Sequence, residues 1–130
     1  MDKSNPHELT FGFIFDFYKK YKIYNMTAEF TDANFQSSVI ENDKLTVIDF
    51  WAEWCGPCRA IAPAMEELSN QFAGKVTIGK LNVDHNPNIS MNYGITSIPS
   101  ILFIKGGKVV DKQVGAVPKN VIEKKILAHL

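Results

Sequence analysis

The sequence has few cysteines, no surplus of charge and no long apolar run. Two cysteines in 130 residues cannot form a disulfide scaffold, so packing must hold the fold together. Fourteen basic residues balance fourteen acidic ones, which argues against broad electrostatic binding to nucleic acid or acidic membranes. No stretch approaches the roughly 20 apolar residues of a membrane-spanning helix. We therefore expect neither nucleic acid nor a membrane among the partners.

The length, the hydrophobic content and the distribution of aromatic residues fit one compact domain preceded by an extension. A hydrophobic content of 45% is enough for a core, and 130 residues leave little room for two domains. Seven of the 15 aromatic residues fall within residues 1–25, so the composition shifts sharply near Met26. We expect residues 1–25 to be an N-terminal extension and residues 26–130 to be the domain.

The extension admits several interpretations. Its start carries Asp2 and Glu8, and Asp16 ends its short apolar run, which is not the pattern of a secretory signal. We therefore expect a cytoplasmic protein. Three possibilities stay open for residues 1–25: an anchor at a surface or membrane interface, an accessory segment packed on the domain, or sequence upstream of a natural start at Met26.

Strands and helices alternate along the domain. A nearly continuous apolar run predicts a strand over 45–51, and the next strand is expected over 76–83. Two more strands, over 101–104 and 109–114, are joined around Gly106-Gly107 and are expected to form a hairpin. Helical spacing and capping residues predict helices over 32–40, 55–72, 86–93 and 118–130. Strands linked first by helices and then by a hairpin predict an α/β fold, with a mixed sheet covered on both faces.

The two cysteines flank Gly56 and Pro57 in a C-x-x-C motif. The predicted helix begins here, and its N-terminus directs unpaired N–H groups and a partial positive charge at Cys55. This favours the thiolate, which is the nucleophilic form. We predict that Cys55 attacks a disulfide and that Cys58 resolves the product. A zinc site needs four ligands, and only three scattered histidines accompany the pair, so we expect no metal.

Residues 47–58, V-I-D-F-W-A-E-W-C-G-P-C, resemble the active-site signature of the thioredoxin family, which is itself the usual example of C-x-x-C chemistry. The resemblance continues through Ile61-Ala62-Pro63, Lys80-Leu81-Asn82-Val83-Asp84, Tyr93-Gly94-Ile95, Ile98-Pro99-Ser100, Gly106-Gly107 and Val114-Gly115-Ala116. It covers residues 26–130 and none of the extension. It implies the thioredoxin fold, a central mixed sheet of about five strands flanked by about four helices.

Asp49 is an unusual residue for an apolar strand, because a buried carboxylate is costly unless it is satisfied or functional. Burial should raise its pKa toward neutrality, which suits a proton relay. The resemblance places Asp49 beneath Cys58, whose proton it would accept, with Lys80 of the next strand as its partner. The alternative is a buried Asp–Lys pair that only stabilises the fold.

The resemblance also implies a cis peptide bond before Pro99. The backbone of Ile98 would then lie beside the cysteines and pair with an extended substrate. The resemblance implies a shallow, apolar substrate groove there, to which Trp54, Ser97 and Gly115 also contribute.

The family resemblance implies a monomeric protein disulfide reductase that contributes to cell redox homeostasis. It implies no bound cofactor, since NADPH would supply electrons through a flavin-containing thioredoxin reductase. Family substrates would include ribonucleotide reductase, methionine sulfoxide reductase and peroxiredoxins.

Two other functions fit the sequence less well. An exported oxidant or isomerase is disfavoured by the Gly-Pro pair between the cysteines and by the missing signal. A binding module with incidental thiols is disfavoured because Asp49, Lys80 and Pro99 are all present.

Overall fold

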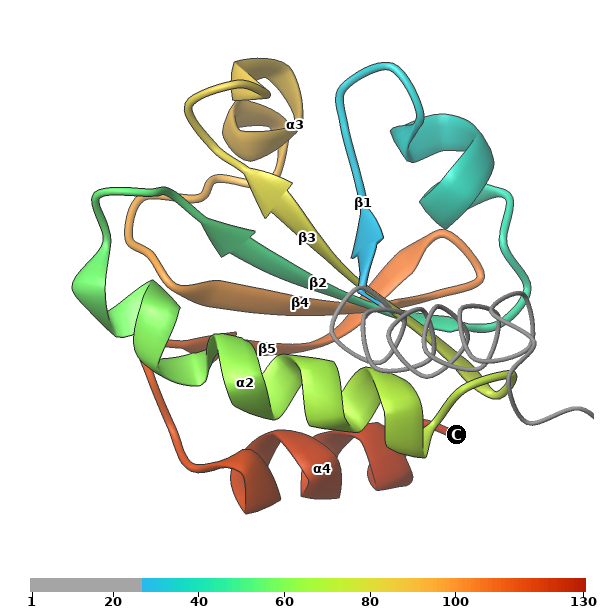
Figure 1. Cartoon of the computed structure of the whole chain (residues 1–130). Coiled ribbons are helices and arrows are strands. Elements are labelled where there is room, and N and C mark those ends of the chain that lie inside the picture. Colours follow the sequence, from blue (N-terminus) through green and yellow to red (C-terminus); the bar gives the residue numbers. More distant parts are fainter. Residues whose placement is uncertain (1–26) are drawn as a thin grey trace, which may run out of the picture.

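The computed structural model describes residues 27–130, and the expectations for residues 1–25 lie outside them (Figure 1). One sheet has the strand order β1-β3-β2-β4-β5. Its strands are β1 (Ala28–Glu29), β2 (Leu45–Trp51), β3 (Val76–Asn82), β4 (Ser100–Lys105) and β5 (Lys108–Val114). The helical elements of this part are η1 (Gln36–Ile40), α2 (Gly56–Gln71), α3 (Pro87–Asn92) and α4 (Lys119–Ala128).

The sheet is mixed, as predicted. Strand β2 runs parallel to β3 and antiparallel to β4, which forms a hairpin with β5. Helices α2 and α4 lie on one face of the sheet, and η1 and α3 lie on the other (Figure 1). Each face has its own apolar core: Leu68 and Ile126 pack on the first, and Phe30 and Phe50 on the second. The predicted α/β architecture is confirmed.

The first predicted helix, 32–40, is shorter in the structure. A turn precedes η1, held by two reciprocal hydrogen bonds in which the side chains of Thr31 and Asn34 accept from each other's backbone N–H groups. Thr31 or Asp32 would cap a helix that began at residue 32. The carboxylate of Asp32 instead accepts from the N–H groups of Asn88 and Ile89 and so caps α3.

The carboxyl ends of β2 and β3 meet at one edge of the sheet, where Trp51 pairs with Asn82. Helix α2 starts just after β2, which brings the C-x-x-C motif to this edge. Ligand sites of open α/β sheets commonly lie at such an edge. The fold therefore places the C-x-x-C motif at this edge, where Gly56 and Pro57 are exposed and both cysteines are nearly fully buried.

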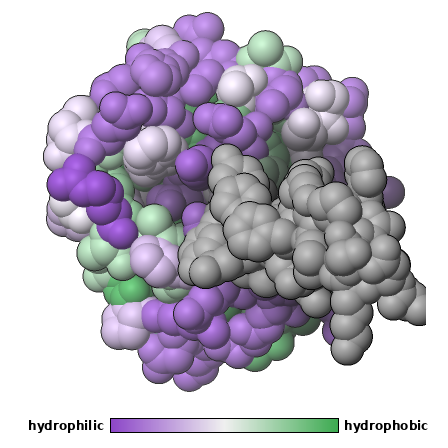
Figure 2. Space-filling view, in the orientation of Figure 1, coloured by the Kyte–Doolittle hydropathy of each residue, from purple (hydrophilic) through white to green (hydrophobic). Residues whose placement is uncertain are grey.

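Hydrophilic residues predominate over the coloured part of the face that Figure 2 shows. Seven large apolar side chains are nevertheless exposed between residues 27 and 130, and Trp54 and Met91 are the most exposed of them, at 68% and 78%. No helix within this range is long and apolar enough to cross a membrane.

Candidate active site

Cys55 and Cys58 are joined by a disulfide, with their sulfur atoms 2.16 Å apart and their Cα atoms 5.3 Å apart. Cys55 is the N-cap residue of α2, and its Sγ accepts a hydrogen bond from the backbone N–H of Cys58 at 3.2 Å. Pro57 occupies the first turn, where its missing N–H breaks no helical bond. A negative charge on Cys55 would thus meet a donor that is already in place.

Asp49 lies in the middle of β2 and is only 5% exposed. Among residues 27–130, its Oδ1 has no hydrogen-bond partner. Burial raises the pKa of Asp49 from 3.8 to about 7, and the positive charge of Lys80 partly opposes that rise. Asp49 is therefore poised to take up and release a proton near neutral pH.

A cavity of about 90 Å³ connects Asp49 with Cys58. Its remaining walls come from Trp51, Arg59, Ala62 and Lys80. The cavity is large enough for at least one water molecule. Its lining includes the polar residues Asp49, Arg59 and Lys80 but is mostly apolar. Cys58 and Asp49 therefore share one cavity, which a proton exchanged between them would cross.

Lys80 lies next to Asp49 in the sheet, because the two residues are partners in the parallel β2–β3 register. Its Nζ sits 5.0 Å from the centre of the Trp51 ring. Lys80 thus acts on Asp49 through its charge while it makes a cation–π contact with Trp51. The side chain of Lys80 is exposed, so this arrangement differs from a sealed ion pair.

A second hollow, of about 250 Å³, opens beside the cysteines. It is lined by Trp54, Val83, Ile95, Thr96, Ser97 and Ile98. The exposed indole of Trp54 is held in place by its Nε1, which donates to Asp84 at 2.9 Å. We call this hollow the Trp54 groove.

The peptide bond between Ile98 and Pro99 is cis. The Pro99 carbonyl accepts from the N–H of Gly115 at 2.8 Å, which draws the loop after β5 toward the cis proline. Gly115 has a φ of +88°, a conformation that glycine adopts readily. It supports Pro99 but does not line the Trp54 groove, whereas Ser97 and Ile98 do.

Gly56 is exposed, and a Cβ added there would have no heavy atom within 4 Å. The first turn of α2 consequently leaves open space beside the cysteines. An approaching substrate backbone can use that space.

Several residues of the site were not found by sequence reasoning. Asp84 orients Trp54, while Trp51 and Arg59 line the Asp49 cavity. Asp84 follows β3 just as Trp54 follows β2, so the shared edge of two parallel strands was an available signal. Within residues 27–130, no group of three or more His, Cys, Asp or Glu side chains could hold a metal.

Comparisons with known proteins agree with this geometry. The family model named Thioredoxin matches residues 26–128. A thioredoxin from Chlorobaculum thiosulfatiphilum is 57% identical over 102 residues, which span 78% of this chain and 94% of the relative. Thioredoxin 1 from Nostoc sp. is 45% identical over 103 residues, 79% of this chain and 96% of that protein. These proteins are disulfide oxidoreductases, and the chain belongs to the thioredoxin family, with Cys55 and Cys58 as its redox centre.

Proposed function

We propose that the chain works as a reductant of protein disulfides in the cytoplasm. Cys55 attacks a substrate disulfide as the thiolate, forming a mixed disulfide and releasing one substrate thiol. Cys58 then attacks the Sγ of Cys55 and releases the second. Two electrons pass from the dithiol to the substrate, and the Cys55–Cys58 disulfide remains. The observation that carries the proposal is the hydrogen bond from Cys58 N–H to Cys55 Sγ.

Pro57 supports the reducing direction. An N-cap side chain accepts from the N–H groups of the second or third helical residue, and proline at the second position has no N–H to give. Cys55 Sγ therefore has one such donor where another sequence would supply two. When the thiolate is only modestly stabilised, the dithiol gives up its electrons readily. A strongly stabilised reduced form would instead make the protein an oxidant.

Asp49 serves in this scheme as the base for the second step. Because the pKa of Asp49 is about 7, the ionised and the protonated carboxyl are both populated near neutral pH. An ionised carboxylate takes the Cys58 proton through the shared cavity, which leaves Cys58 as a thiolate. Lys80 is a positioning residue here, because its charge keeps the pKa of Asp49 from rising further.

The test of the reducing direction is the equilibrium between the Cys55–Cys58 pair and glutathione. We expect the pair to stay a disulfide even when reduced glutathione is in large excess over its disulfide, because a strong reductant passes its electrons to glutathione disulfide. Acid quenching and thiol alkylation, read by mass spectrometry, give the two populations. A pair that glutathione reduces readily would make the protein an oxidant or isomerase instead.

The Trp54 groove is the proposed docking surface for an extended segment of the substrate, with Ser97, Ile98 and Gly115 arranged around Pro99. Trp54→Ala should raise the KM for a disulfide-bonded protein such as insulin about tenfold, or about 1.4 kcal/mol, because an aromatic anchor is lost. The kcat should change little, since the cysteines are untouched.

Met91→Ala is the matched control for Trp54→Ala. Met91 is as exposed as Trp54 but does not line the groove, so the Met91→Ala variant should keep the KM of the unaltered protein. Equal effects of the two variants would show that exposed apolar surface in general, and not the groove, captures the substrate.

The partners follow from this role. A flavin-containing thioredoxin reductase would regenerate the dithiol with electrons from NADPH. Ribonucleotide reductase, methionine sulfoxide reductase and peroxiredoxins are the proposed acceptors. We also propose that residues 26–130 act as a monomeric redox domain and that residues 1–25 are an added extension, a layout supported by the family match to residues 26–128.

A further inference from the structure

The indole of Trp54 depends on Asp84 for its orientation. The backbone before it is held separately, because the Arg59 guanidinium donates to the carbonyl of Glu53. The Trp54 side chain is 68% exposed, so packing restricts it only weakly. Its single N–H donates to the Asp84 carboxylate at 2.9 Å. The direction in which the ring faces the groove therefore depends on where Asp84 holds its carboxylate.

Asp84 is held in turn by the side chain of Asn82. The Oδ1 of Asn82 accepts from the backbone N–H of Asp84 at 3.0 Å and from that of His85 at 3.4 Å. A bond from an asparagine side chain to the backbone two residues later forms an Asx turn, which fixes the local path of the chain. Asn82 consequently sets the position from which the Asp84 carboxylate reaches the indole.

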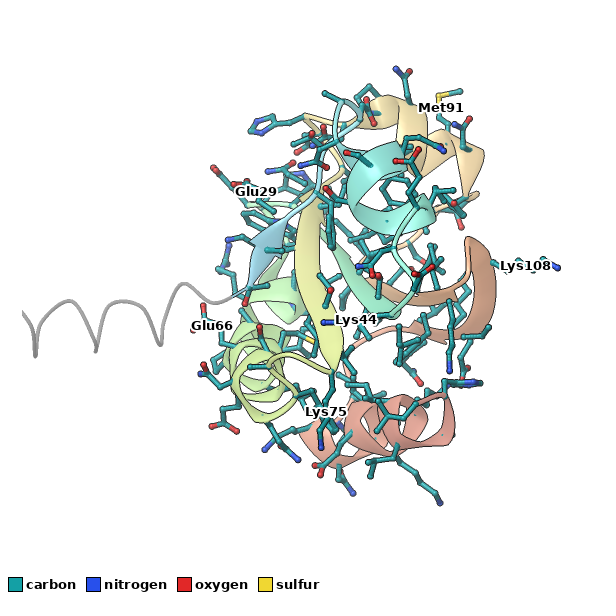
Figure 3. The ribbon with its side chains drawn as sticks, turned by 90° about the vertical axis from the view of Figure 1, so that its right-hand side faces the viewer. Glu29, Lys44, Glu66, Lys75, Met91 and Lys108 are labelled. Carbon is teal, nitrogen blue, oxygen red and sulfur yellow. A yellow bond between two sulfur atoms is a disulfide. The ribbon has the colours of Figure 1, made fainter. Side chains whose placement is uncertain are left out.

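Asn82 is a firm base for this turn. It is the last residue of β3, pairs with Trp51 in the sheet and is only 7% exposed. Its carbonyl accepts from Asn86 Nδ2 at 3.1 Å, at the start of α3. In Figure 3, Lys75 just before β3 and Met91 on α3 lie toward opposite ends of the molecule, so β3 ends toward α3. A buried, hydrogen-bonded amide moves less than an exposed ring.

We propose that Asn82 is a positioning residue for substrate capture, which acts on Trp54 through Asp84. The proposal rests on the proposed function of the Trp54 groove. An indole that is already held in place loses less rotamer freedom when a substrate docks, so the substrate binds more tightly. Asn82 lines neither the Trp54 groove nor the Asp49 cavity. Its loss should therefore raise KM and leave kcat unchanged.

Two substitutions of Asn82 test its acceptor oxygen. Asn82→Ala removes this oxygen, whereas Asn82→Asp keeps one in its place. With insulin as substrate, Asn82→Ala should raise KM about threefold at unchanged kcat, the effect of one lost hydrogen bond of ordinary strength. Asn82→Asp should keep the KM of the unaltered protein.

Asn86→Ala is the matched control for Asn82→Ala. Asn86 is 8% exposed, and its side chain bonds the backbone of Asn82 and of Asp32 but not Asp84. Its loss also removes a buried amide, so it should destabilise the fold and leave KM unchanged. An equal rise of KM in both alanine variants would overturn the proposal, because general loosening of the fold would then explain it.

Nanosecond fluorescence anisotropy tests the positioning without a substrate. In a Trp51→Phe background, Trp54 is the only tryptophan of the chain. Asn82→Ala should about double the amplitude of the fast depolarisation of Trp54, because an exposed ring that is not held rotates on this timescale. Asn82→Asp and Asn86→Ala should leave this amplitude unchanged. An unchanged amplitude in Asn82→Ala would overturn the proposal.

A double-mutant cycle shows whether Asn82 acts through Asp84. Asp84→Ala should raise KM at least as much as Asn82→Ala, and combining the two should raise it no further. Additive effects would overturn the proposal. Failure of the groove itself is distinguishable, because Trp54→Ala would then leave KM unchanged. That result would remove the role of Asn82 in capture, whereas faster depolarisation in Asn82→Ala would still show that Asn82 holds the ring.

Discussion

Cys55→Ser is expected to abolish disulfide reduction, whereas Cys58→Ser is expected to stop the reaction at the mixed disulfide. Exposure does not distinguish the two thiols, since Cys55 is 4% exposed and Cys58 is 2% exposed. Their positions on α2 do, because Cys55 caps the helix and its Sγ accepts the Cys58 N–H, while Cys58 faces the Asp49 cavity. The serine hydroxyl is a far weaker nucleophile than a thiolate, so activity should fall to background without Cys55.

Mass spectrometry after mixing with excess glutathione disulfide separates the two roles. Reduced Cys58→Ser should gain one glutathione on Cys55 and hold it, because no second thiol can displace it. Reduced Cys55→Ser should stay nearly unmodified. The opposite pattern would reverse the assignment of attacking and resolving thiols. Each variant is the other's control, since both lose one sulfur and the disulfide.

The same Cys55→Ser variant separates a reductase from a binding module. A chain that acts only by binding would keep its biological activity without the nucleophile. Loss of activity in cells, together with an intact fold, would assign the biological role to disulfide exchange.

Most of the fold was predictable because its elements carry strong local signals. Strand β2 is apolar at most of its positions, and α2 repeats apolar residues at helical spacing. Strand β1 was missed because two residues cannot show a period. Gly79 was an indirect signal for it: a Cβ there would lie 2.4 Å from the Phe30 ring and 2.7 Å from the Ala28 carbonyl oxygen. A glycine inside a strand often marks such a close approach.

The candidate site, too, was only partly predictable from the sequence. Asp49 was identifiable because a carboxylate in an apolar strand contradicts the pattern around it, and the C-x-x-C spacing is explicit. The Lys80 contact with Trp51 was not predictable, because a long side chain on a strand can reach several neighbours and only the folded geometry selects one. Whether the Gly115 loop reaches the groove or only supports Pro99 also depends on the tertiary structure.

Asp49→Asn is expected to stabilise the fold in a strongly pH-dependent way. The pKa of Asp49 rises from 3.8 to about 7 on folding, mainly through burial. Between these values the folded state keeps a proton that the unfolded state has lost, so stability falls as the pH rises. The full cost above pH 7 is about 4 kcal/mol, at 1.36 kcal/mol per unit of pKa. Asparagine stays neutral and avoids this cost.

Urea unfolding of the oxidised protein at pH 4, 6 and 8 measures the effect. The variant should gain up to about 4 kcal/mol at pH 8 and little at pH 4, where the aspartate of the folded chain is protonated anyway. Asp43→Asn, at an exposed position, is the matched control and should keep the original pH dependence. Destabilisation at pH 8 would mean that Lys80 more than offsets burial, and that the pair only supports the fold. A more stable variant that resolves mixed disulfides more slowly would instead show that the buried carboxylate is retained for its chemistry at the expense of stability.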